Sequence, residues 1–544
     1  MSAQTTAFSP PKPAADVSGV AIPRKWMIAH LVSLALVGLV MVIAARGQWF
    51  FYDEWDFLAE RAEWSLLAPH NGHLSFFPQL LTTLVKGAVG LHSYWPYLAL
   101  TLLAHLAVVH MVWRLMMRLD DSPVIVLLVA LVFGLLAAGT ENTLWAFQIG
   151  FIAPLATGIA ALLLAMRPSL PPWRLAGISV LLLAGVGFAS TGLPIALAVM
   201  LFIAVRHGWR KALVVAASFA LVYGTWYLLF ARGTTGSDGF GAQTIGDVLV
   251  RMPEYVAHGL VDSLGKALPS AGLAPALVLL IVLGIILDVR RSGARALDAS
   301  YFLAFAALVF AVLTAYTRVG LGVESASAGR YVYIYGALFA PLIGRLLSRL
   351  VGTSRAATAV VSVILLVLAG YNAGGTIVAG REQAAIEQTV NRTISAALTI
   401  DDGSAELAGR TPAAAVAPTL TMADVRAFVA RGQYTPVPFT PTDLLDAQVN
   451  LLLTATPVDG ATPDPRDCEP VVDGWVSIDP ESQAVYAPTP GIVRVSAEED
   501  GVQSFRAQIP ITDAGMNELS GLDSSVDLRL GSDDAGGLCV VTTR

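Results

Sequence analysis

Residues 26–46 read WMIAHLVSLALVGLVMVIAAR, an apolar run in which the only Lys, Arg, Asp or Glu is the last residue. A helix of about 20 apolar residues is long enough to cross ~30 Å of hydrocarbon. The residues before it lack a signal-peptide cleavage pattern, so we expect the run to stay in the membrane as an anchor. Residues 1–23, rich in Pro, Ala, Ser and Thr, are predicted to form a disordered cytoplasmic tail.

Similar apolar runs recur as far as residue 373. The chain is 55% hydrophobic and only 14% charged, with a mean hydropathy of +0.65, whereas a soluble protein carries about a quarter charged residues. We therefore predict an all-α polytopic membrane bundle over residues 24–373. Its eleven spans lie near 26–46, 95–113, 123–140, 147–166, 175–190, 192–206, 211–230, 272–289, 300–317, 330–347 and 356–373. The pair 175–206 is short for two crossings and is also compatible with a re-entrant hairpin, which leaves the parity unchanged.

The distribution of Lys and Arg predicts the orientation. One set of connections holds fifteen of them in short loops, and the opposite, longer set holds eight. Positive charge accumulates on the cytoplasmic side, so we place the N-terminus in the cytoplasm of a cell membrane and the C-terminus outside. Residues 74–91 are apolar but contain Pro78 and Lys86. Counting them as a span would reverse every later loop, so we predict a helix on the outer membrane surface there.

The first outer connection contains three carboxylates in four positions: Asp53, Glu54 and Asp56 within WFFYDEWDF at 49–57. Carboxylates held close together against apolar walls have at least one raised pKa, which suits a general base near neutral pH. The alternative is an interfacial aromatic belt with a few surface acids.

His70, Asn71 and His73 follow in the same connection. On a helix face or in a tight turn, the two histidines can share a divalent cation with Asp53 or Glu54. The alternative, which we favour, is local hydrogen bonding or contact with substrate, with no metal site.

The other outer connections are also polar. Glu141, Asn142 and Gln148, around Trp145, either hold sugar hydroxyls or cap helix ends. Residues 231–271 include a predicted second surface helix, either a lid or a plain interfacial helix.

Two arginines stand on the outer side, against the positive-inside bias. Arg318 and Arg330 bracket a Gly-rich stretch that contains Glu324, and Tyr331 follows. Arginine binds phosphate in a bidentate manner, so these residues are predicted to meet the phosphate of a lipid carrier. The alternative is an ion pair of Arg318 with Glu324, or of Arg330 with an acid of the first loop.

This arrangement resembles the GT-C class of membrane glycosyltransferases, which includes protein O-mannosyltransferases and arabinosyltransferases. The matching features are Asp53-Glu54 after the first span and the surface helix at 74–91. The resemblance implies that Asp53 or Glu54 deprotonates an acceptor hydroxyl in an inverting transfer. It implies a polyprenyl-phosphate sugar donor held by Arg318 and Arg330, a mapping made by position and chemistry only. No Trp-Trp-Asp motif of the oligosaccharyltransferase type occurs.

Residues 374–544 are predicted to form an extracytoplasmic α+β domain, β-rich from about residue 469. We expect helices at 381–399 and 421–432 with Thr421 as a cap, and strands at 491–496, 504–508 and 526–530. The two cysteines, Cys468 and Cys539, are predicted to form a disulfide that encloses the β region. From residue 374 on, 24 acidic against 10 basic residues give a net charge of −14, which argues against nucleic-acid binding.

These features favour a glycosyltransferase in the lipid bilayer that transfers sugar to a cell-envelope glycan, lipid or protein acceptor. A transporter or flippase of envelope precursors is the first alternative, but it predicts paired charges near mid-membrane and internal repeats. We find no repeats, and the middle of the spans is almost free of ionisable residues apart from His105 and His110. A non-enzymatic scaffold with a glycan-binding domain is the second, and it leaves the acidic aromatic loop unexplained.

Overall fold

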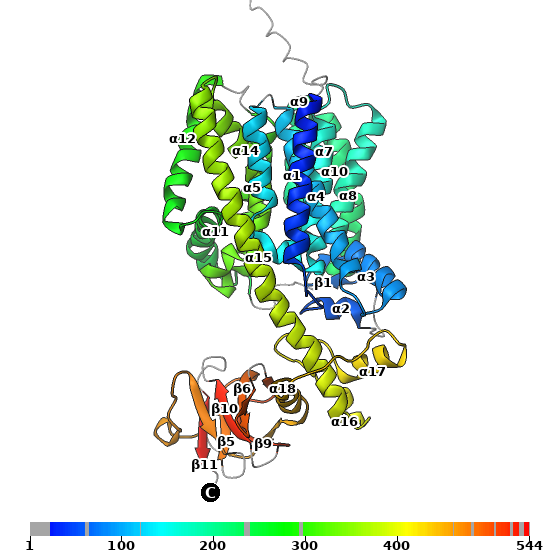
Figure 1. Cartoon of the computed structure of the whole chain (residues 1–544), viewed down its shortest axis with the longest axis vertical. Helices are drawn as coiled ribbons and strands as arrows, with labels where there is room; N and C mark the ends of the chain where they lie inside the picture. Colours follow the sequence, from blue (N-terminus) through cyan, green and yellow to red (C-terminus); the bar gives the residue numbers. More distant parts are fainter. Residues whose placement is uncertain are drawn as a thin grey trace, which may run out of the picture.

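The computed structural model describes residues 22–542 except 60–64, 120, 233–239, 293–296, 461, 480–482, 505–506, 523–525 and 532–537. A helix bundle is joined by one long helix to a β-rich C-terminal domain (Figure 1). The predicted tail lies, except for residues 22 and 23, outside the described residues.

Apolar helices build the bundle, as the sequence predicts for a membrane protein. Within the described ranges, eight helices are long and apolar enough to cross a membrane. They are built on α1 (Arg24–Ala44), α4 (Trp95–Met117), α7 (Ile149–Ala165), α10 (Trp209–Trp226), α12 (Ala274–Ser292), α13 (Ala299–Arg318), α14 (Gly329–Val351) and α15 (Arg355–Ile400). The shorter apolar helices α8 (Pro172–Phe188) and α9 (Gly192–His207) coincide with the two short predicted spans. The total of eleven crossings stays a prediction.

The span predicted at 123–140 is broken rather than straight. Helix α5 (Pro123–Gly134) and the segment Ala137–Leu144, which includes α6 (Thr140–Leu144), are bent by 48°. Side chains of α15 bind the backbone groups that the break frees, since Asn372 accepts the Ala137 N–H at 3.0 Å and Thr376 donates to the Leu135 carbonyl at 3.0 Å. The bend turns α6 toward the start of α14.

The segment after α1 gathers at one end of the bundle. It contains α2 (Glu54–Leu58), a hairpin of β1 (Pro69–His70) and β2 (His73–Leu74), and α3 (Phe76–Val89). Figure 1 places this segment at the end from which α15 continues to the C-terminal domain, and we call it the domain-facing end. Helix α3, at 14 residues, is ~21 Å long and too short to span a bilayer. Its Lys86 is buried and donates to the Leu58 carbonyl at 2.9 Å, so this charge faces protein.

The boundary predicted at residue 374 falls inside a helix. Instead of a span at 356–373 and a separate helix at 381–399, α15 runs for 46 residues without a break, ~69 Å in length. Its second half passes from the bundle to the C-terminal domain (Figure 1). The hydropathy pattern shows where the apolar part of this helix ends, but it does not show where the helix itself ends.

Three short helices precede the β structure: α16 (Ala405–Ala408), α17 (Met422–Ala430) and α18 (Pro441–Leu452). The predicted cap at Thr421 is confirmed as a capping box with Asp424, and Thr440 with Asp443 forms a second one.

The predicted β-rich region consists of two antiparallel sheets that pack on a common apolar core. One has the order β4-β10-β6-β7 with β8 beside β6, and the other β11-β5-β9-β3. The strands are β3 (Thr454–Val458), β4 (Trp475–Ile478), β5 (Gln483–Ala487), β6 (Gly491–Glu499), β7 (Val502–Gln503), β8 (Ala507–Ile511), β9 (Gly515–Ser520), β10 (Asp527–Gly531) and β11 (Cys539–Thr542). The predicted disulfide between Cys468 and Cys539 is confirmed.

Candidate active site

Asp53 lies at the N-terminus of α2, at the domain-facing end of the bundle. Its side chain is half-buried, and none of the described residues donates a hydrogen bond to its carboxylate. Burial and the neighbouring Asp56 carboxylate raise the pKa of Asp53 to about 6, while the charges of Arg330 and Arg318 oppose this rise. The structure therefore brings the acidic loop and both late-loop arginines together. A carboxylate with this pKa is largely ionised at pH 7 and able to accept a proton.

The two arginines differ in how far their charges are neutralised. Arg330, in the first turn of α14, donates to Glu141 through its guanidinium at 2.6 Å and through its backbone N–H at 2.9 Å. The guanidinium also lies 5.1 Å from the ring centre of Tyr331. Arg318, at the end of α13, has no ion pair with any carboxylate in the described part of the chain. Its charge is thus uncommitted, which is the property that an anion-binding residue needs.

Neither ion pair that the sequence offered as an alternative is formed among the residues that the structure describes. Arg330 pairs with Glu141 of the second connection because the bend after α5 presents α6 to α14, whereas the alternative named an acid of the first loop. The Glu324 side chain is 90% exposed and lies 3.6 Å from His258 on α11 (Met252–Lys266), and it does not pair with Arg318.

Glu54 is buried, unlike Asp53, and its carboxylate accepts hydrogen bonds from three donors. The Tyr94 hydroxyl and the Phe147 N–H donate to Oε1 at 2.8 and 3.2 Å, and the Phe51 N–H donates to Oε2 at 2.9 Å. Burial raises the pKa of Glu54 to about 8, although the three donors favour the ionised form. With both oxygens engaged, Glu54 ties α2 to the segments around Tyr94 and Phe147.

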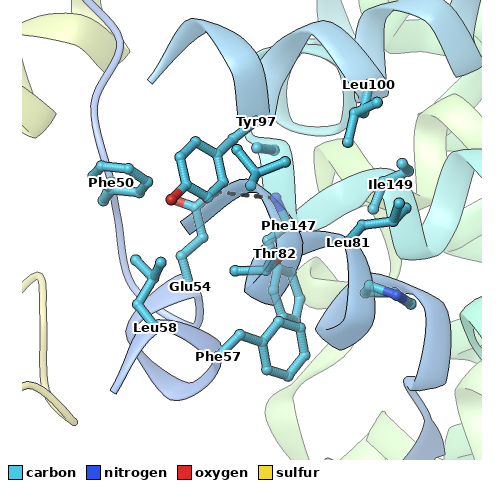
Figure 2. A pocket seen from close by; sticks show the side chains of 13 residues that line it. Phe50, Glu54, Phe57, Leu58, Leu81, Thr82, Tyr97, Leu100, Phe147 and Ile149 are labelled. Atoms are coloured by element: carbon cyan, nitrogen blue, oxygen red, sulfur yellow. Dashed lines mark hydrogen bonds between the residues drawn. The ribbon is translucent and has the colours of Figure 1, made fainter. Parts of the chain in front are cut away.

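The walls around Glu54 explain its burial. A small open pocket lies among α2, α3, α4 and the start of α7. Figure 2 shows Glu54 beside Tyr97, with its hydrogen bond to Phe147, facing the apolar side chains of Leu81, Leu100 and Ile149.

The two histidines flank a tight turn, one of the two geometries considered from the sequence. Asn71 and Gly72 have φ of 48° and 75°, as a two-residue hairpin turn requires. His70 Nδ1 lies 3.8 Å from Asp56 Oδ2, and its ring packs on Phe57 at 4.8 Å.

His73 stands close to Arg318. Burial, with smaller contributions from Arg318 and His70, lowers the pKa of His73 to about 4, so its ring is neutral at pH 7. Its Nδ1 is buried without a hydrogen-bond partner within the described residues. A neutral ring offers no charge to an anion, but it remains available for a hydrogen bond.

The described residues offer no ligand set for the divalent cation that the sequence left open. No group of three or more His, Cys, Asp or Glu side chains in these ranges is placed to hold a metal ion. Of the proposed ligands, Glu54 is already engaged with three donors.

Asn142 and Gln148 lie apart from the accessible site. They are 0% and 1% exposed. Asn142 lies on α6, which is packed against α4, α14 and α15, and Gln148 lies in the following turn, Ala146–Gln148, which is packed against α4 and α7. In their place, the aromatic rings of Phe51, Trp145 and Phe147 form a row with centroid separations of 5.6 and 5.3 Å.

Two residues that support the candidate site were not predicted from the sequence. The Tyr94 hydroxyl accepts the Ala146 N–H at 2.7 Å while donating to Glu54. Glu387, on the second half of α15, is 0% exposed and accepts the Trp49 N–H at 2.6 Å. A tyrosine just before a span gives a weak signal of such a role. Glu387 gives none, because the sequence around it resembles any soluble helix.

A comparison of the chain with models of known protein families finds no match, and a comparison with curated proteins finds none either.

Proposed function

We propose that this chain is a membrane glycosyltransferase that transfers a sugar from a polyprenyl-phosphate donor to a hydroxyl group of a cell-envelope acceptor. The observation that carries the proposal is the placement of Asp53, a half-buried carboxylate without a hydrogen-bond donor among the described residues, beside Arg318 and Arg330. These groups lie at one end of a bundle of long apolar helices, which is where the phosphate of a membrane-anchored donor would lie.

In the proposed reaction, Asp53 accepts the proton of the acceptor hydroxyl as that oxygen attacks the anomeric carbon. The new C–O bond forms while the bond from the anomeric carbon to the phosphate oxygen breaks, and the lipid phosphate leaves. Negative charge grows on the leaving phosphate, and arginine donors directed at it stabilise the transition state. Arg318 supplies the uncommitted positive charge, and Arg330, already half-neutralised by Glu141, supplies the second contact.

We place the reaction on the outer side of the membrane. The fifteen-to-eight bias of Lys and Arg puts the N-terminus in the cytoplasm, and the domain-facing end is then extracytoplasmic. The Cys468–Cys539 disulfide supports the same side, because disulfides persist in oxidising compartments.

Changing Arg318 tests the donor site directly. Arg318→Gln is expected to lower kcat/KM for the polyprenyl-phosphate sugar about 10- to 100-fold, since a charged hydrogen bond contributes about 1.5–3 kcal/mol. The measurement is transfer of labelled sugar from the synthetic donor by purified protein. Arg46→Gln is the control, because Arg46 is an exposed arginine just after α1. Equal kinetics of the two variants would remove Arg318 from the donor site.

The pH dependence tests the base. The pKa of Asp53 is raised to about 6, so the carboxylate is ionised above this pH and protonated below it. We expect kcat/KM to fall about tenfold per pH unit below 6 and to level off above it. An acidic limb centred near pH 4 would indicate an exposed, unperturbed carboxylate and contradict this assignment.

A further inference from the structure

Tyr52, the residue directly before Asp53, has a backbone conformation that is unusual for its type. Its φ is 49°, in the left-handed region. The other described non-glycine residues with positive φ are Asn71, Asp473 and Asp500, and Asn and Asp tolerate this conformation. An aromatic residue held there is strained, and the strain persists only where the surroundings enforce it.

The contacts that enforce it come from the other end of the chain. The Tyr52 N–H donates to the Val416 carbonyl at 3.0 Å. The Tyr52 side chain is 42% exposed, so its own packing does not explain the conformation.

Val416 belongs to residues 410–434, between α16 and α18, which we call the strap. The strap is docked on the first connection by apolar and backbone contacts. The ring of Phe428 lies 6.5 Å from that of Trp55, the ring of Tyr434 lies 6.1 Å from that of Trp49, and the Leu91 N–H donates to the Gln433 carbonyl at 2.7 Å. The strap thereby fixes the loop on both sides of Asp53.

We infer that Tyr52 is a positioning residue whose left-handed backbone, held by the Val416 carbonyl of the strap, keeps the Asp53 carboxylate within the electrostatic influence of Arg318 and Arg330. This inference rests on the proposed function and deepens it. Asp53 is half-buried by virtue of the turn at Tyr52, because the Glu54 and Trp55 N–H groups bond back to the Phe51 and Tyr52 carbonyls at 3.2 Å each. Relaxing Tyr52 to negative φ would rotate the following peptide and move Asp53.

Two variants with opposite backbone preferences test this inference. Tyr52→Gly adopts positive φ freely, whereas the β-branched side chain of Tyr52→Val resists it more strongly than tyrosine does. We expect Tyr52→Gly to keep kcat within about threefold of the parent and Tyr52→Val to lose about tenfold, with little change in donor KM. Tyr52→Phe and Tyr52→Asn should have a kcat close to that of the parent. Full activity in Tyr52→Asn would show that the aromatic ring is not needed. If Tyr52→Gly and Tyr52→Asn both lose activity while Tyr52→Phe keeps it, the inference is overturned and the Tyr52 side chain itself is required.

A second measurement is independent of turnover. Carbodiimide modifies protonated carboxyl groups, and mass spectrometry of the Asp53 peptide against pH gives the midpoint of its protonation. Glu54, Asp56, Arg318 and Arg330 are the charged groups that act on or adjoin this carboxylate. The midpoint should be near 6 in the parent and in Tyr52→Gly, and should move toward 4 in Tyr52→Val as Asp53 moves into water. Identical midpoints in Tyr52→Gly and Tyr52→Val would refute positioning, even if no glycosyl transfer is found. Absence of transfer alongside the expected shift would refute the function alone.

Discussion

Asp53→Asn is expected to lower the rate of sugar transfer by about 10²- to 10⁴-fold, the contribution of a positioned general base. The amide keeps the size of the carboxylate but has no basic site for the acceptor proton. The folded protein should be as stable as the parent or slightly more so, because burial raises the pKa of Asp53 and so disfavours its charge. The measurement is kcat for transfer of labelled sugar, with thermal unfolding of the same sample in detergent.

Glu54→Gln provides the matched comparison at the adjacent acid. Above pH 8, where Glu54 is ionised and accepts all three hydrogen bonds, the NH₂ group of the new side chain would face a donor, either the Phe51 N–H or the pair formed by the Tyr94 hydroxyl and the Phe147 N–H. An unsatisfied buried donor destabilises by about 1–3 kcal/mol, so this variant should unfold earlier while each folded molecule retains most of its activity. If Glu54→Gln instead abolishes turnover at unchanged stability, and Asp53→Asn does not, the roles of the two carboxylates must be exchanged.

Hydropathy and charge predicted which segments surround the candidate site. Runs of about 20 apolar residues predicted the long helices, and the apolar stretch at 74–91 forms the shorter helix α3. Because successive outer loops meet at one end of a bundle, Asp53, Arg318 and Arg330 were expected to be neighbours, and the charges of both arginines do act on Asp53.

The distinction between Asp53 and Glu54 was beyond the sequence, because it depends on long-range contacts. Both are acids in one aromatic loop, and only the fold brings Tyr94 and the Phe147 N–H to Glu54. The burial of Asn142 has the same origin, since it follows from a helix break stabilised by Asn372 and Thr376, more than 200 residues away. The strap is a third example, because nothing in residues 410–434 indicates what they dock against.

Gly380→Ala is expected to be strongly destabilising although it improves helix propensity. At this position α15 meets the end of α1, and a Cβ atom on Gly380 would lie 2.3 Å from the Ala44 carbonyl oxygen and 2.9 Å from its carbon. Both atoms are backbone, so no rotamer change relieves the overlap and the two helices must separate. Overpacking of this kind costs about 1–3 kcal/mol, and a rigid backbone contact belongs at the upper end of that range.

Gly374→Ala is the control on the same helix. No atom lies within 4 Å of the added Cβ, so the substitution should stabilise the helix by up to about 1 kcal/mol. The two substitutions therefore have opposite expected signs in thermal unfolding of the purified protein. The proposed transfer activity should also fall in Gly380→Ala, because the end of α1 leads into the loop that carries Asp53. Gln48 donates to the Gly380 carbonyl at 2.8 Å, and the Trp49 N–H binds Glu387 on the same helix. Displacement of α15 would pull this loop, and Asp53 with it, away from the arginines. Equal unfolding temperatures for the two variants would mean that α1 and α15 do not meet at Gly380.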